Sequence, residues 1–443
     1  RGAAGMSEAI RADVRADVSA PGGGATRGDG TGAGSGSDDG RPVAKAILDA
    51  VLEGNSVVVT VLAIFSAVVV GGLLIAFTDP PVLHAWGQLF SNPGNAFVQA
   101  WDAASGAYSA MFESAIINPH AVAAAFHGGS VTAVFNPLSE TAVNATPLIL
   151  AGLSVALAFR AGLFNIGAAG QFIGGAMIAG WIGFAVNLPV VIHVVVAVIG
   201  GFVGGAIVGW FVGFLKARTG AHEVIVTIML NYVMEFLILY LLGLTVFRQK
   251  GRPDPISPPV AGNATLPHLF GSVLRVNAGF LVALAAAAAV WWLLERTTIG
   301  FQLRTVGSNS KAARSAGMSP ESTWIVVMLI AGGLAGLAGS AVVQGTDFVL
   351  TPQIYGTYGF DAITVALLGR AKPGGTVLAS LLFGALHAGG IGMQAQTQIP
   401  VDIVTVLQSL IVLFVAAPPL MREVFRLRST RAAGQLEARG WSG

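Results

Sequence analysis

Residues 306–320 read V-G-S-N-S-K-A-A-R-S-A-G-M-S-P and separate two long apolar stretches of the chain. The segment is rich in Ala and in basic residues, which favours a short helix. Gly317 is placed to end that helix, and Pro320 lies just beyond it, as is common after a helix terminus. The chain from Arg296 to Arg314 carries four basic residues. We therefore expect a soluble docking helix between two membrane helices, engaged by a cytoplasmic partner.

The composition of the chain is that of an integral membrane protein. Its 443 residues are 54% hydrophobic and only 10% charged, and the mean hydropathy is +0.73, well outside the soluble globular range. The absence of Cys excludes disulfides, thiolate metal sites and Cys nucleophiles. A net charge of +2 gives little support for a nucleic-acid partner. The expected surroundings are a lipid bilayer.

Apolar runs begin at Asn55 and are long enough to cross a bilayer core, which takes about 20 helical residues. We expect an all-α polytopic membrane protein with about ten transmembrane helices. The expected spans are 55–78, 142–160, 167–187, 189–215, 223–246, 277–295, 322–344, 358–370, 375–393 and 401–420.

The basic residues predict the orientation of these spans. They fall on one side of the array at Arg41, Lys45, Lys216, Arg218, 296–314, Arg370, Lys372 and 422–431. Because Lys and Arg collect in cytoplasmic loops, both termini are expected in the cytoplasm. Residues 46–159 contain no Lys or Arg, so we assign 79–140 to the external side. The loop 247–276 is also expected outside, as a proline-rich structured cap, although it carries four basic residues.

Three parts of the chain are expected. Residues 1–40 are rich in Gly and Ser and offer too little apolar surface to offset the entropy of ordering, so they are expected to form a disordered cytoplasmic tail. Residues 41–426 form the transmembrane domain, and 427–443 a second cytoplasmic tail. Within 79–140, four residues recur near helical spacing and predict an amphipathic helix that lies on the membrane or contacts a soluble partner. They are Phe97, Trp101, Tyr108 and Met111.

Glycine recurs at every fourth position of the fourth expected span, at Gly201, Gly205, Gly209 and Gly213. Such a ridge lets another helix backbone approach closely, so its expected role is helix packing. The seventh span repeats the small-residue pattern at Gly332, Gly336 and Ser340. Both spans are therefore expected in the interior of a tight bundle.

Polar residues inside the spans are candidates for lining a translocation path. Thr227, Asn231 and Glu235 share one helical face because they are four residues apart. Such residues either line a path or form interhelical hydrogen bonds. Further candidates are Asn165 and Gln171, in an irregular segment at 160–171, and Asp361, Thr364 and Gln408. That segment is either a broken helix inside a path or a tight turn at the membrane surface.

Enzyme motifs are absent from the sequence. No G-x-x-x-x-G-K-[ST] loop is present to bind nucleotide phosphates, so the chain is not expected to hydrolyse ATP. His222 and Glu223 begin a zinc-protease motif, but Val226 stands where the second His is needed, and no metal site is expected. A non-catalytic membrane subunit is indicated. The alternative is an ion-coupled secondary transporter or channel for a small polar solute, with protons or ions carried by Glu235, Asp361 or Asp402.

Four runs of the sequence carry a resemblance to a known family. They are A-T-P-L-I-L-A-G-L-S-V-A-L-A-F-R-A-G-L-F-N-I-G-A-A-G-Q (145–171), H-E-V-I-V-T-I-M-L-N-Y (222–232), G-F-D-A-I-T-V-A-L-L-G-R-A-K-P-G-G (359–375) and V-L-Q-S-L-I-V-L-F-V-A-A-P (406–418). These runs resemble permease subunits of ABC importers for nucleosides and simple sugars. The resemblance extends from about Arg41 to Arg426. The chain departs from the family pattern at Ala169, at His222 and at the pair Asn309-Ser310.

The resemblance implies the ABC importer transmembrane fold, in the plasma (inner) membrane of a bacterium. It implies a complex with a second permease chain, a paralogue rather than an identical copy, with cytoplasmic ATPase subunits and with an extracytoplasmic substrate-binding lipoprotein. ATP and Mg would bind the ATPase subunits, and no cofactor would bind this chain. A nucleoside or related simple-sugar solute would move inward by alternating access. The resemblance also implies a coupling helix in 306–320, whose residues are Gly307, Asn309, Lys311, Ala312, Arg314, Ala316 and Gly317.

Overall fold

Helices form the regular structure of this protein. The computed structural model describes residues 56–271, 273–416, 423 and 425. Apart from one isolated bridge between His268 and Asn277, all regular elements in these ranges are helical. The predicted all-α class is thus confirmed. The tails predicted at 1–40 and 427–443 lie outside the described residues.

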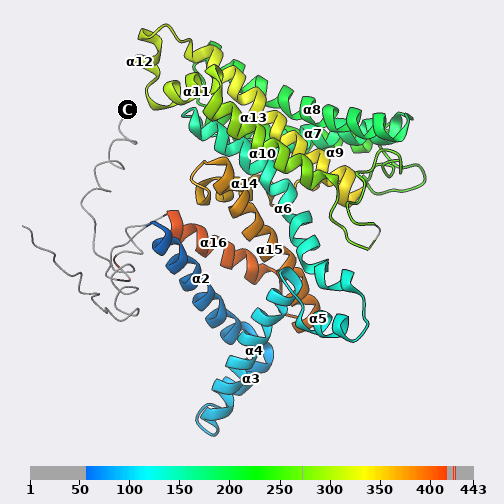
Figure 1. Cartoon of the computed structure of the whole chain (residues 1–443), viewed down its shortest axis with the longest axis vertical. Coiled ribbons are helices and arrows are strands. Elements are labelled where there is room, and N and C mark those ends of the chain that lie inside the picture. The colour runs from blue at the N-terminus through cyan, green and yellow to red at the C-terminus, as the bar shows by residue number, and fades with distance from the viewer. Residues whose placement is uncertain (1–55, 272, 417–422, 424, 426–443) are drawn as a thin grey trace, which may run out of the picture. The chain divides into compact units, whose positions relative to one another are not determined.

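The helices follow one another with short connections, except after α9 (Figure 1). They are α2 (Ser56–Thr78), α3 (Pro80–Gly87), α4 (Pro93–Ala115), α5 (Pro119–Phe126), α6 (Val131–Arg160), α7 (Ala168–Ala185), α8 (Val190–Thr219), α9 (Glu223–Gly243), α10 (Ala278–Arg296), α11 (Thr298–Ser308), α12 (Ser310–Ser315), α13 (Pro320–Val342), the π-helix η1 (Val343–Asp347), α14 (Tyr358–Leu368), α15 (Pro373–Thr397) and α16 (Asp402–Ala416).

Eight helices of the described chain are long and apolar enough to cross a membrane. They are α2, α6, α7, α8, α9, α10, α13 with η1, and α15. The spans predicted at 358–370 and 401–420 correspond to α14 and α16, which have only 11 and 15 residues. The span predicted to start at residue 142 belongs to a helix that begins at Val131. Pro137 and Glu140 make its first turns less apolar, so hydropathy alone places the boundary too late.

Helices α8 and α13 cross in close backbone contact along their small residues. A Cβ atom added at Gly205 would lie 2.6 Å from Cα of Gly336, and one added at Gly209 would lie 2.9 Å from Cα of Gly332. Both distances are shorter than the roughly 3.5–4.0 Å at which carbon atoms pack. The two backbones therefore touch directly. The predicted glycine ridge on α8 lies at this crossing, with Gly201 beside Ser340 and Gly213 beside Ile325.

Helix α4 contains the predicted amphipathic segment, and its two halves have different surroundings. Phe97 and Trp101 are exposed, at 63% and 74%. Toward the other end, the Tyr108 hydroxyl donates to the Val68 carbonyl of α2 (2.6 Å), and Met111 packs against Gly389 of α15. The second half of α4 thus lies between two membrane helices.

The long segment between α9 and α10 folds against the ends of α7 and α13. The Val260 amide donates to the Phe348 carbonyl (2.7 Å), and the Ala261 amide donates to the Gly183 carbonyl (3.0 Å). The Ser257 hydroxyl, completely buried, accepts from the Leu350 amide (2.8 Å). These bonds fix an irregular segment over the helix ends, because each satisfies backbone groups that no helix supplies with a partner.

Candidate functional site

The connection between α6 and α7 is a buried, non-helical segment held by side-chain amides. Asn165 and Gln171 are completely buried and exchange two hydrogen bonds, of 2.8 and 3.0 Å. The Asn165 amide also donates to the Ser154 hydroxyl (3.1 Å), and its carbonyl accepts from the Gly167 amide (3.2 Å). The segment is thus a tight, internally bonded turn whose amide groups lie inside the protein.

Two of the α9 candidates join that turn. The Asn231 carbonyl accepts from the Gly170 amide (2.8 Å), and its amide donates to the Ile166 carbonyl (3.0 Å). Thr227 is completely buried, and a Cβ atom at Gly167 would lie 3.0 Å from it. Four of the eight predicted path residues therefore gather around the start of α7.

Glu235 lies one turn further along α9, in a cavity of about 450 Å³ that we name the α9 cavity. Its lining residues are Ile166, Ala169, Ile173, Ile228, Asn231, Tyr232, Glu235, Tyr355, Phe360 and Ile363. The adjoining face of α9 is apolar and exposed, with Met229, Val233 and Phe236 each more than half exposed. The cavity thus places a carboxyl, an amide and two phenols beside an uncovered helix face.

The other path candidates lie apart from this group. The Thr357 hydroxyl donates to the Asp361 carboxylate (2.5 Å) at the start of α14, and Thr364 lies one turn further along the same helix. Gln408 is buried on α16, which packs mainly against α2. None of these three residues lines the α9 cavity.

The predicted docking helix is α12, six residues long. The Asn309 side chain caps it by accepting from the Lys311 amide (3.1 Å) and the Ala312 amide (3.0 Å). Gly317 follows the last turn with φ +83°, and its amide donates to the Arg314 carbonyl (3.0 Å). This is the glycine stop that the sequence predicts. The Lys311 and Arg314 side chains are exposed, and Arg314 pairs with Glu321.

Helix α11 attaches α12 to the α6–α7 connection. A Cβ atom at Gly307 would lie 2.9 Å from Cα of Ala161, so the backbones of α11 and of this connection are in direct contact. Arg160, the last residue of α6, donates from Nε to the Ala371 carbonyl (2.9 Å) between α14 and α15. A displacement of α12 would therefore reach the amide-bonded turn through packed backbone.

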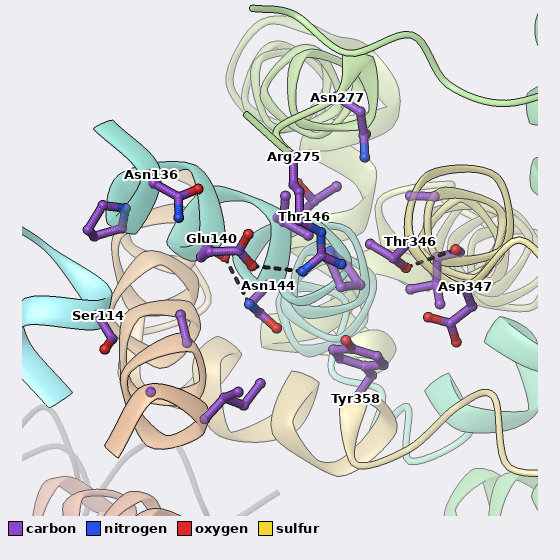
Figure 2. Close-up of a pocket in the computed structure, with 18 of the residues that line it drawn as sticks. Ser114, Asn136, Glu140, Asn144, Thr146, Arg275, Asn277, Thr346, Asp347 and Tyr358 are labelled. Carbon is purple, nitrogen blue, oxygen red and sulfur yellow. Dashed lines mark hydrogen bonds and ion pairs between the residues drawn. The ribbon is translucent and has the colours of Figure 1, made fainter. Parts of the chain in front are cut away.

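Figure 2 shows a second cavity, of about 530 Å³, which we name the α6 cavity. Glu140 of α6 accepts from Arg275 (3.0 Å) across it, and the Asn144 amide donates to the Glu140 carbonyl (2.8 Å). Asp347 at the end of η1 and Tyr358 at the start of α14 complete the polar wall.

The α6 cavity was not predicted from the sequence, although a periodic pattern of polar residues marks it. Asn136, Glu140 and Asn144 are each four residues apart, which is the pattern that identified the polar face of α9. The predicted boundary at residue 140 divided this set between a loop and a span. Arg275 and Asp347 carry no such periodic signal, because Arg275 lies in the connection before α10 and Asp347 is the last residue of η1, both far away in the sequence.

Replacing Asn165 with Leu is expected to destabilise the protein markedly. The change leaves the buried amide of Gln171 and the hydroxyl of Ser154 without their partner, at a cost of about 1–3 kcal/mol per unsatisfied group. Thermal unfolding of the detergent-purified chain measures this loss. The double variant Asn165→Leu, Gln171→Leu should lose less than the sum of the two single changes; additive losses would contradict a shared hydrogen-bond cluster.

These features define an α-helical integral membrane protein with polar groups gathered inside the bundle and a short basic helix at one of its ends. Residues 137–416 match the family described as branched-chain amino acid transport system / permease component, and the chain belongs to this family. The resemblance drawn from the four sequence runs is confirmed.

Several curated proteins that are similar to this chain are named as permeases. The chain is 38% identical to the guanosine ABC transporter permease protein of Bacillus subtilis over 288 residues, which are 65% of this chain and 83% of the relative. It is 37% identical to a glucose ABC transporter permease protein of Haloferax volcanii, over 62% of this chain and 75% of the relative. It is 35% identical to a nucleoside ABC transporter permease protein of Lactococcus lactis, over 63% and 79%. No solved structure matches the chain significantly.

Proposed function

We propose that this protein is the permease subunit of an ABC importer and moves a nucleoside or related simple-sugar solute inward by alternating access. The observation that carries the proposal is α12, whose basic residues are exposed while α11 ties it to the α6–α7 connection at Gly307. An ATPase subunit that moves α12 would thereby act on the turn beside the α9 cavity. The names of the relatives support the solute class.

The basic residues support an orientation with α12 in the cytoplasm. Lys216 at the end of α8 pairs with Glu223 (2.6 Å) and lies 4.9 Å from the ring centre of Trp324. Arg160 reaches the α14–α15 connection, and Gly307 contacts the end of α6. These contacts place the basic ends of several helices together, as expected for the cytoplasmic side of a membrane protein.

The α9 cavity is the proposed translocation path, completed by a second permease chain. The apolar face of α9 beside the cavity is exposed in the single chain, and in the proposed complex the second chain covers it. The solute would then pass between the two chains, along Asn231 and Glu235. We expect the second chain to be a paralogue, as the family resemblance implies.

The proposed complex also contains cytoplasmic ATPase subunits, which bind ATP and Mg, and an extracytoplasmic substrate-binding lipoprotein. Its location is the plasma membrane of a bacterium. ATP binding and hydrolysis would shift the complex between states in which the path opens to one side or to the other.

Purification of the tagged chain from its native host in mild detergent tests the proposal. Mass spectrometry should identify an ATPase subunit and a second permease in stoichiometric amounts. Membrane vesicles that contain this complex should take up guanosine only when ATP is supplied on the cytoplasmic side. Recovery of the chain alone, or uptake that follows an ion gradient without ATP, would overturn the importer assignment.

A further inference from the structure

The α6 cavity has the size of a small-molecule site. Its volume of about 530 Å³ falls within the roughly 300–1,000 Å³ typical of ligand pockets. Its walls come from the end of α4, the first half of α6, Arg275 and Asn277 just before α10, the end of α13 with η1, the start of α14, and α15 (Figure 2). All of these elements belong to one chain, so the cavity needs no second subunit to be complete.

The charged side chains of the cavity are mostly carboxylates. Among the described residues, Glu113, Glu140 and Asp347 line it, and Arg275 is the one basic residue of the lining. Arg275 is paired with Glu140 at 3.0 Å. In the described part of the chain, the lining therefore has two more carboxylates than basic groups. Such a wall attracts hydrogen-bond donors and repels anions.

Two prolines add acceptors to the same wall. Pro137 and Pro147 lie inside α6 and have no N–H, so they cannot donate to the carbonyls of Ala133 and Val143, four residues earlier. All four residues line the cavity. The Ala133 and Val143 carbonyls therefore lack the amide donor that the residue four positions later usually supplies in a helix.

The base of the cavity lies next to the α9 cavity. Tyr358 lines the α6 cavity, and its ring stacks on Phe172 of α7 with centroids 5.8 Å apart. Tyr355 and Phe360, on either side of Tyr358 in the sequence, line the α9 cavity. The segment 355–360 at the start of α14 therefore contributes side chains to both cavities.

We propose that the α6 cavity is a solute-binding site within a single permease chain, selective for neutral solutes rich in hydrogen-bond donors, such as nucleosides, and closed to their phosphorylated forms. This inference rests on the proposed function for its solute. The hydroxyl and amino groups of a nucleoside donate to Glu113, Asp347 and the freed carbonyls of α6. A phosphate group meets the same carboxylates and is repelled.

The natural absence of Cys in the chain allows a direct test. In the membrane-reconstituted complex, a single Asn144→Cys change places one thiol in the cavity. Cationic (ethyltrimethylammonium) and anionic (ethylsulfonate) methanethiosulfonate reagents are then compared there and at Ser91→Cys, an exposed position outside the cavity. The ratio of the labelling rate with the cationic reagent to that with the anionic reagent should be about tenfold higher at residue 144 than at residue 91, as expected for two nearby carboxylates. Equal preferences would overturn the charge selection.

Variants without the carboxylate charges identify the groups that cause the preference for the cationic reagent. Glu113→Gln combined with Asp347→Asn should remove most of the cationic preference at residue 144, because both substitutions keep the side-chain size and remove the charge. Glu295→Gln, which neutralises an exposed carboxylate on α10 outside the cavity, should leave it unchanged. A preference that survives the double variant would assign the selectivity to another part of the protein.

Protection by solute tests binding. Guanosine should slow labelling at residue 144 several-fold and guanosine monophosphate should not. Failure of guanosine to protect in a complex that transports guanosine would overturn the site. Labelling needs no transport, so absence of guanosine uptake by the unmodified complex would count against the proposed function, whereas the reagent preference would still decide the charge selection of the cavity.

Discussion

Gly205→Leu is expected to prevent this protein from folding into a stable bundle. A side chain at this position would enter the backbone of α13, since even a Cβ atom would lie 2.6 Å from Cα of Gly336. Overpacking costs about 1–3 kcal/mol where side chains can move aside. The neighbours here are main-chain atoms that cannot move independently, so we expect a cost above that range and loss of most of the monodisperse protein in detergent size-exclusion chromatography.

Gly243→Leu is the matched control for this prediction. Gly243 is the last residue of α9, and a Cβ atom there would have nothing within 4 Å. The same substitution should therefore leave the yield and the melting temperature near those of the unmodified chain. Equal yields of the two Leu variants would show that the α8–α13 crossing does not depend on glycine.

Lys311→Glu combined with Arg314→Glu is expected to reduce ATP-dependent uptake at least tenfold while the chain stays folded. A tenfold loss corresponds to about 1.4 kcal/mol of coupling. Both side chains are exposed on α12, and the one buried residue of that helix, Ala313, is unchanged. The reversal of charge would weaken docking of an ATPase subunit. Uptake in vesicles and recovery of the ATPase with the tagged chain measure the effect.

Two further variants separate docking from local disruption. Lys311→Glu alone breaks no ion pair in the described part of the chain, whereas Arg314→Glu also loses the contact with Glu321. The single Lys311→Glu variant should therefore show a measurable reduction of ATP-dependent uptake, smaller than that of the double variant. Lys250→Glu reverses a charge in the segment between α9 and α10 and should leave uptake unaltered. Full uptake by the double variant would remove α12 from the coupling role.

Much of the candidate site follows from residues close together in the sequence. Asn309, Gly317 and the basic residues between them define α12, because capping and helix termination depend on neighbours only a few positions away. The Thr227–Glu235 face was recognised for the same reason, since helical periodicity alone brings these residues together. The contacts of each side chain could not be predicted from this periodicity. Asn231 bonds to the α6–α7 connection and the start of α7, whereas Glu235 lines a cavity.

The sequence by itself determined the all-α membrane class, the positions of most long helices and the existence of the short helix α12, because hydropathy, spacing and capping are local properties. Only the tertiary structure decided that Asn165 and Gln171 satisfy each other in a buried turn, that Gly307 rests on the end of α6, and that Glu140 meets Arg275 across a cavity. The last two pair residues more than 130 positions apart, and all three depend on how the helices pack. No local pattern encodes such packing, because it results from the fit of the whole bundle.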